Sequence, residues 1–114
     1  MATITPVINA PISGVASYTW ETVTENDTAS AVIPAGSEPI FGSIQFTGTF
    51  GGATGVLQGS NDASNWVTLK DPNGTAVSTT AVGAFEFSTA MTYLRPSFSA
   101  GTSQDVDVVM VLRG

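Results

Sequence analysis

Side chains that could perform covalent chemistry are scarce in this sequence. Histidine and cysteine are both absent, and lysine occurs once, at Lys70. Ser–His and Cys–His pairs, imidazole metal sites and zinc–thiolate sites are therefore excluded. The surroundings of Lys70, "TLKDP", are typical of a strand that ends in a turn, whereas a reactive amine needs apolar burial. We predict that the chain is not an enzyme and has no catalytic residue and no cofactor.

Two carboxylates near the C-terminus have a spacing that could suggest acid–base chemistry. Asp105 and Asp107 lie two residues apart on an expected strand, so they share one face at a separation of about 7 Å. In glycosidases the two carboxylates stand on opposite walls of a cleft. Neighbouring positions on one strand are more typical of a solvated face that discourages pairing at a sheet edge. We predict a surface role for both.

Oxygen ligands for calcium could come from four Asx residues, namely Asn61, Asp62, Asp71 and Asn73. Their spacing is not that of an EF-hand loop, and Asx residues favour turns because their side chains bond to nearby backbone. The glycines between positions 48 and 59 could suggest a phosphate loop, but no helix follows to supply aligned donors. We therefore expect turns here and no metal site.

The charge balance limits the partners of the chain. The net charge is −6, and the only basic residues are Lys70, Arg95 and Arg113. A nucleic-acid-binding protein commonly neutralises roughly 6–10 phosphates, which three scattered cations cannot do. We predict no binding to nucleic acid and none to anionic membranes. The opening "MATITPVINAPISG" lacks the basic and apolar regions of a secretory signal, and no apolar run reaches the roughly 20 residues of a membrane span. We expect synthesis in the cytoplasm.

Composition and periodicity predict a single all-β domain. The chain has 114 residues, 42% of them apolar, with 12 Gly and 6 Pro. In "SYTWETVT" (17–24), Tyr18, Trp20 and Thr22 fall on one face and Val23 on the other. The clearest core strand lies in "SEPIFGSIQFTGTF" (37–50), and "DPNG" (71–74) has the chemistry of a turn. Short strands separated by turn signals at intervals of about 8–12 residues favour an antiparallel β-sandwich or jelly roll over residues 16–114.

Residues 1–15 are expected to form an extended N-terminal arm, because Pro6 and Pro11 oppose both helix and central strand. The arm carries four apolar side chains that need cover, and we predict that they bind a partner: Ile4, Val7, Ile8 and Ile12. Two interpretations remain open. The arm either packs along its own domain or lies on a neighbouring subunit.

The stretch "LQGSNDASNWVTLKDPNGT" resembles a hairpin with the pattern "LQGSNDG-NW-TL". That hairpin recurs in small β-sandwich virion proteins of tailed bacteriophages, of the capsid decoration or cement type and related tail-associated proteins. Residues 55–75 carry the resemblance. It implies a structural protein on the capsid exterior that binds the major capsid protein, stabilises capsomer contacts and forms a homo-oligomer, most simply a trimer.

Within this hairpin we predict five bracing residues: Leu57, Asn61, Asp62, Asn65 and Trp66. Trp66 follows directly on the polar loop and is expected to cover its apolar flank, with a ligand platform as the alternative. Ala63 stands where the pattern usually has glycine. We expect the loop to move the strained backbone conformation onto an Asn or Asp, which tolerates it.

Two alternative functions stay open. A carbohydrate- or receptor-binding module of a phage tail or spike would expose two or three aromatic rings on one face, drawn from Tyr18, Trp20, Trp66 and Tyr93. A head–tail connector or tail component would assemble into rings instead of trimers.

Overall fold

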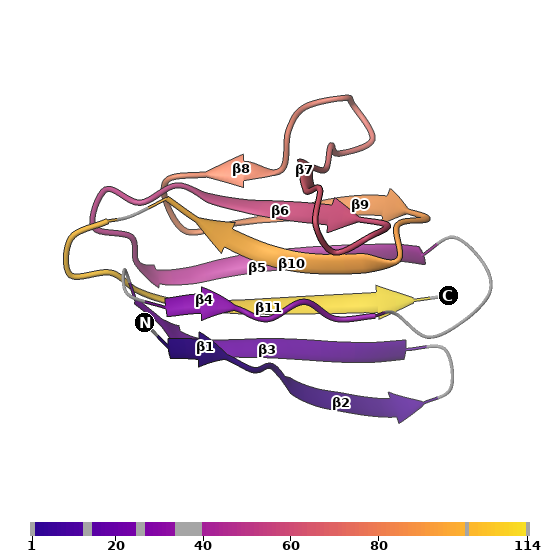
Figure 1. Cartoon of the computed structure of the whole chain (residues 1–114), viewed down its shortest axis with the longest axis horizontal. Helices are drawn as coiled ribbons and strands as arrows, with labels where there is room; N and C mark the ends of the chain where they lie inside the picture. The colour runs from indigo at the N-terminus through magenta and orange to yellow at the C-terminus, as the bar shows by residue number, and fades with distance from the viewer. Residues whose placement is uncertain (1, 13–14, 25–26, 34–39, 100, 114) are drawn as a thin grey trace.

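The computed structural model describes residues 2–12, 15–24, 27–33, 40–99 and 101–113. No helix occurs among them, and the strands stack in two layers, which confirms the predicted β-sandwich (Figure 1). The strands are β1 (Ala2–Ile4), β2 (Val7–Ile12), β3 (Val15–Val23), β4 (Asp27–Ala29), β5 (Ile40–Thr49), β6 (Gly55–Ser60), β7 (Val67–Thr68), β8 (Ser78–Thr79), β9 (Gly83–Thr89), β10 (Tyr93–Phe98) and β11 (Asp105–Arg113).

The large sheet has five antiparallel strands in the order β2-β3-β11-β5-β9. The C-terminal strand β11 lies in its centre, between β3 and β5 (Figure 1). Along β11 four apolar side chains point into the core and alternate with half-buried or exposed ones: Val106, Val108, Met110 and Leu112. This alternation is the two-residue period of a strand with one buried face.

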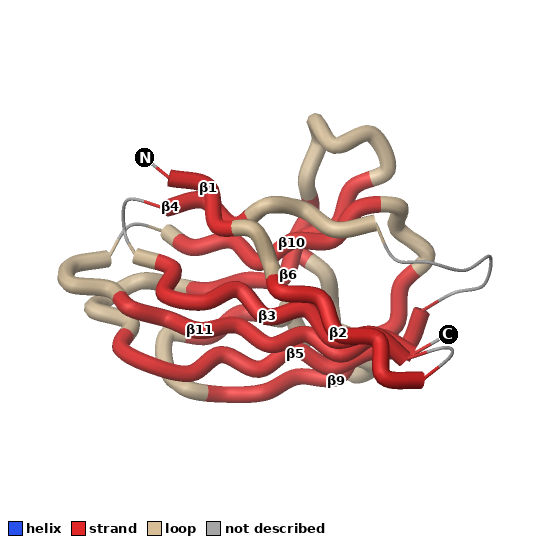
Figure 2. The backbone as a smooth tube through the Cα atoms, turned by 90° about the horizontal axis from the view of Figure 1, so that it is seen from below, coloured by secondary structure: helices blue, strands red, loops and turns tan. Residues whose placement is uncertain are grey.

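The second layer is assembled from shorter strands. β6 pairs with β10, β7 and β8, while β4 pairs in parallel with β1. The two groups join where Val32 and Leu94 exchange both backbone hydrogen bonds, at 2.8 and 3.0 Å. Figure 2 shows this layer lying over the large sheet. Pro96 lies two residues beyond Leu94, on the outer edge of β10, so its missing N–H interrupts no pairing with β6.

The core fills the space between the layers. Trp20, Ile44 and Phe46 come from the large sheet, and Leu57 and Leu94 come from the other layer; all five are fully buried. The ring of Phe46 meets that of Phe98 edge-on, with centroids 5.9 Å apart. The core strand expected in 37–50 is confirmed as β5 over its described residues, and Ile44, Phe46 and Phe50 are all buried as expected.

A β-bulge corrects the expected faces of β3. Glu21 and Thr22 lie opposite Asp107 alone, because Trp20 pairs with Val108 and Val23 with Val106. Thr22 has φ 54°, and its backbone N–H donates to Asp107 Oδ1 at 2.8 Å. The extra residue moves Thr22 to the surface and turns Val23 into the core.

The described residues of the expected N-terminal arm contribute one strand to each layer of the sandwich. β1 pairs with β4, and β2 forms the outermost strand of the large sheet, beside β3. Ile4 is half-buried against the core, whereas Val7 and Ile8 are 60% and 62% exposed. Ile12 lies in β2 opposite Val15, and its side chain is outside the described part of the structure.

Candidate functional site

The loop at residues 60–65 is organised by one carboxylate. Asp62 Oδ1 accepts hydrogen bonds from Ser60 Oγ, Ser64 N and Asn65 N at 2.8–2.9 Å, and Oδ2 accepts one from Asn65 Nδ2 at 2.7 Å. These donors, the backbone N–H groups first, hold the pKa of Asp62 well below its ordinary value. Ser60, which is buried, accepts in turn from Asp62 N and Ala63 N. The loop is thus fixed without an apolar core of its own.

The left-handed backbone position of this loop is Ala63 itself, with φ 59°. The expectation that Asn61, Asp62 or Asn65 would take that conformation is wrong. Asn61 instead links this loop to the next one, since its Oδ1 accepts from Thr92 N at 3.1 Å. The two hydrogen bonds that Asp62 makes to the backbone at positions 64 and 65 hold the chain in this turn, which forces Ala63 into the left-handed region.

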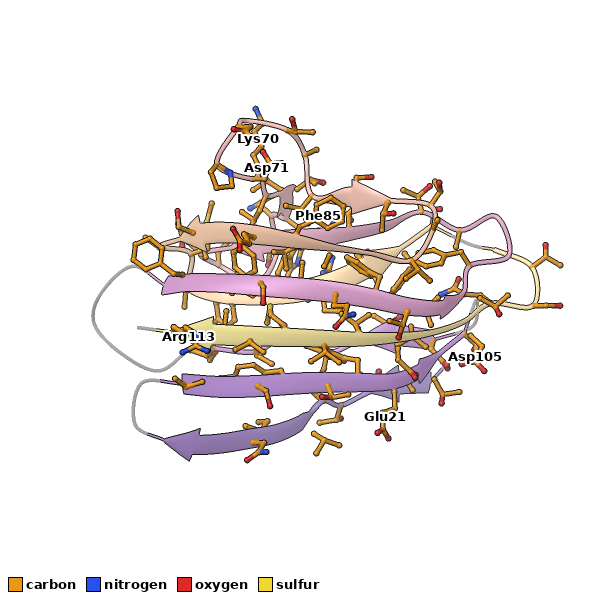
Figure 3. All side chains as sticks on the ribbon, turned by 180° about the vertical axis from the view of Figure 1, so that it is seen from behind. Glu21, Lys70, Asp71, Phe85, Asp105 and Arg113 are labelled. Atoms are coloured by element: carbon orange, nitrogen blue, oxygen red, sulfur yellow. The ribbon has the colours of Figure 1, made fainter. Side chains whose placement is uncertain are left out.

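The second Asx-rich turn, at residues 71–75, is also held by an aspartate that accepts hydrogen bonds from the backbone. Asp71 Oδ1 accepts from Asn73 N and Thr75 N, both at 2.9 Å, and Gly74 occupies the left-handed position with φ 83°. Lys70 and Asp71 lie on a loop that projects from the sandwich (Figure 3). Within the described residues no group of three or more His, Cys, Asp or Glu side chains could hold a metal ion.

Trp66 lies on the outer face of the second layer, next to residues from two strands. It is half-buried, and Arg95 Cζ of β10 lies 4.0 Å from the centroid of its ring. Arg95 Nε donates to Gln58 Oε1 of β6 at 2.9 Å, across the paired positions Arg95 and Gln58. Burial lowers the pKa of the guanidinium from its ordinary value. Leu57, the fifth residue of the predicted brace, points the other way into the core.

Arg95 and Gln58 were not predicted as neighbours of Trp66 from the sequence. Arg95 is 29 positions from Trp66, and only the pairing of β10 with β6 brings it over the ring. A signal was nevertheless present: Arg95 alternates with Leu94 and Pro96 on a strand, so it had to face outward. Nothing in the sequence indicates which side chain it would meet there.

Of the four aromatic residues considered for sugar stacking, two lie in the core. Trp20 is fully buried and its Nε1 donates to Ser30 O at 3.1 Å, and Tyr18 is buried beside it. Tyr93 is half-buried, on the same side of β10 as Arg95. The carbohydrate-binding alternative needs a row of exposed aromatic rings. Of the four candidates, only Trp66 and Tyr93 remain available for it.

The remaining charged and apolar surface groups are spread over the molecule. Glu21 and Asp105 lie near one end of the large sheet and Arg113 at the other (Figure 3). A pocket of about 450 Å³ lies beside Arg113, lined in part by Phe41, Glu86 and Val111. Phe41 is 65% exposed.

No helix among the described residues is long and apolar enough to cross a membrane.

Comparison with known proteins finds a similar fold but no matching family. No family model and no curated protein sequence matches the chain. Among solved structures, the crystal structure of the SPBc2 prophage-derived protein YomS is similar: TM-score 0.57 and 12% identity, over 93% of this chain and 100% of that one. This likeness shows a shared fold.

Two further solved structures are similar to a lesser degree. One is to a structure of Bacillus endospore appendages, described as disulfide-linked pili, with TM-score 0.40 and 15% identity over 96% of this chain and 88% of that one. The other is to a carbohydrate-binding module of Cellvibrio mixtus lichenase 5A in complex with cellotriose. It has TM-score 0.31 and 9% identity over 96% of this chain and 85% of that chain.

Proposed function

We propose that the chain is a structural, non-enzymatic virion protein of a tailed bacteriophage that decorates the outside of the head. The observation that carries this proposal is the fold shared with a prophage-derived protein along its whole length. The hairpin of residues 55–75 supports it, because it resembles a pattern that recurs in tailed-phage virion proteins of the decoration, cement and tail-associated types. Its partners would be the major capsid protein and further copies of itself, on the exterior of a capsid assembled in the host cytoplasm.

The outermost strand β2 supplies a surface suited to such contacts. Val7 and Ile8 are neighbours in sequence, so they project to opposite faces of the strand, yet both are mostly exposed. No strand among the described residues pairs with the far edge of β2. Each side chain that becomes fully buried in an interface contributes about 1.5–3 kcal/mol. Contacts repeated by a small cyclic oligomer, such as a trimer, then add up through effective concentration.

The alternative of a carbohydrate-binding module receives less support from the structure. Tyr18 and Trp20 are core residues, and Arg95 already covers one face of Trp66. A tail or connector role uses the same fold and differs in position within the particle, so imaging separates it from the preferred role.

The test uses particles of the phage that encodes the chain. Cryo-electron microscopy should show density for this sandwich on the outer surface of the head. A variant carrying Val7→Lys and Ile8→Lys, added to particles that lack the protein, should bind them much more weakly than the wild type. Val82→Lys is the matched control, because Val82 is 61% exposed but lies outside β2.

Density confined to the tail would refute the decoration role. Unchanged saturation of heads by the β2 double variant would leave the role intact and remove β2 from the interface.

A further inference from the structure

Arg95 is held in one orientation by its neighbours. Its guanidinium lies over the ring of Trp66, and its Nε donates to Gln58 Oε1. A stacked guanidinium with one donor already used keeps its two terminal nitrogens aligned as a fork, which matches the two oxygens of a carboxylate. These two contacts reduce the side-chain entropy that such binding would cost.

No anion of the described chain pairs with this guanidinium. Its side-chain contacts among the described residues are the ring of Trp66 and Gln58 Oε1. Asp62 in the adjacent loop uses both oxygens for its own turn. Asp27 lines a pocket of about 100 Å³ with Arg95, and its Oδ2 accepts from Thr24 N and Thr24 Oγ1. The guanidinium is half-buried, and a cation in that setting is stabilised by an opposite charge placed beside it.

We propose that Arg95 anchors a docking site for an acidic side chain, Asp or Glu, of a partner protein. The terminal nitrogens of the guanidinium donate to the carboxylate, while Trp66 and Tyr93 flank it on the same outer face. Trp, Tyr and Arg are the residues most enriched at the energetic centres of protein interfaces. A sugar acid fits less well, because sugar rings stack on free aromatic faces and Arg95 occupies one face of Trp66.

This inference goes beyond the proposed function and does not depend on it. Carboxylate binding at Arg95 is a property of the isolated chain and can be measured without any phage particle. Absence of the protein from capsids would therefore refute the decoration role alone.

The experiment is an NMR titration of the ¹⁵N-labelled protein with the peptide acetyl-Ala-Glu-Ala-Glu-Ala-amide. The Arg95 Nε–H and Trp66 indole resonances should shift in a saturable manner, with a Kd of about 1–10 mM, and added salt should weaken the binding. The indole of Trp20, which is buried and bonded to Ser30 O, is the internal control and should not move. The same peptide with Gln in place of Glu should give no saturable shift.

Variants locate the site. Arg95→Gln should abolish the Trp66 shift, and Arg95→Lys should weaken binding about tenfold, because lysine keeps the charge but loses the fork. Arg113→Gln, at the end of β11 in the large sheet, should bind like the wild type. Should Arg95→Gln fail to fold, the lysine variant carries the test alone.

Equal shifts with the Gln peptide, a Trp66 shift that survives in folded Arg95→Gln, or wild-type affinity in folded Arg95→Lys would overturn the proposal. Saturable binding of trigalacturonate without binding of the Glu peptide would also overturn it, in favour of a sugar-acid site.

Discussion

The two tryptophans of this chain have opposite surroundings. Trp20 is fully buried between the layers, and its one polar atom donates to a backbone carbonyl. Trp66 is half-buried on the outer face, beside a loop held by a carboxylate and beneath a guanidinium. Apolar burial fixes the first, and hydrogen bonds and charge fix the second. A core position of this kind tolerates little change, whereas the surface around Trp66 can serve recognition.

Of the two tryptophans, Trp20 is expected to contribute more to the free energy of unfolding. Trp20→Ala removes a fully buried ring and should lower the free energy of unfolding by about 3–5 kcal/mol. Urea denaturation measures the change. Trp20→Phe should cost about 1–3 kcal/mol, since it leaves Ser30 O without its donor. A loss below 1 kcal/mol for Trp20→Ala would mean that this ring does not hold the layers together.

A smaller loss of stability is expected when the ring of Trp66 is removed. Trp66→Ala should cost about 1–2 kcal/mol, because much of the indole already contacts solvent. A double-mutant cycle with Arg95→Ala should give a coupling of about 0.5–1 kcal/mol, the usual value for an exposed cation–π pair. Zero coupling would show that the guanidinium and the ring lie together without stabilising each other.

The left-handed backbone positions of the two Asx-rich turns, Ala63 and Gly74, predict a pair of opposite effects of about 1 kcal/mol or below. Ala63→Gly should stabilise the protein by about 0.5–1 kcal/mol, because glycine adopts the left-handed conformation without steric cost. Gly74→Ala should destabilise it by about 1 kcal/mol for the same reason. No atom lies within 4 Å of the added methyl group at Gly74, so the effect there is one of backbone conformation. Thermal melts of both variants measure the two signs; equal signs would contradict the interpretation.

The smallest effect is a pH dependence of the loop. The pKa of Asp62 is lower in the folded than in the unfolded chain, whose ordinary value is about 3.9. Folding therefore favours the ionised carboxylate, and this stabilisation is present above about pH 4 and is lost as pH falls further. The midpoint of thermal unfolding should drop less between pH 5 and low pH in Asp62→Asn than in the wild type. Parallel curves for the two proteins would exclude this contribution.

Strand type, turn chemistry and the clearest core positions were determined by the sequence alone. The alternation of Ile44 and Phe46 with polar neighbours, and the "DPNG" turn, depend on residues within a few positions of each other. Side-chain direction along a strand and the preferences of Asp, Pro and Gly in turns are local properties. The β-sandwich and the outward direction of Arg95 follow from the same local rules.

The register between strands was decided by the tertiary structure. The bulge at Thr22 exists because Asp107, 85 positions away, caps its backbone, and this contact puts Val23 in the core. The places of β1 and β2 beside β4 and β3, and the meeting of Arg95 with Trp66, depend equally on pairing between distant segments. Such pairings are selected by the packing of the whole sandwich, because a one-residue shift would turn every side chain of a strand to the other face.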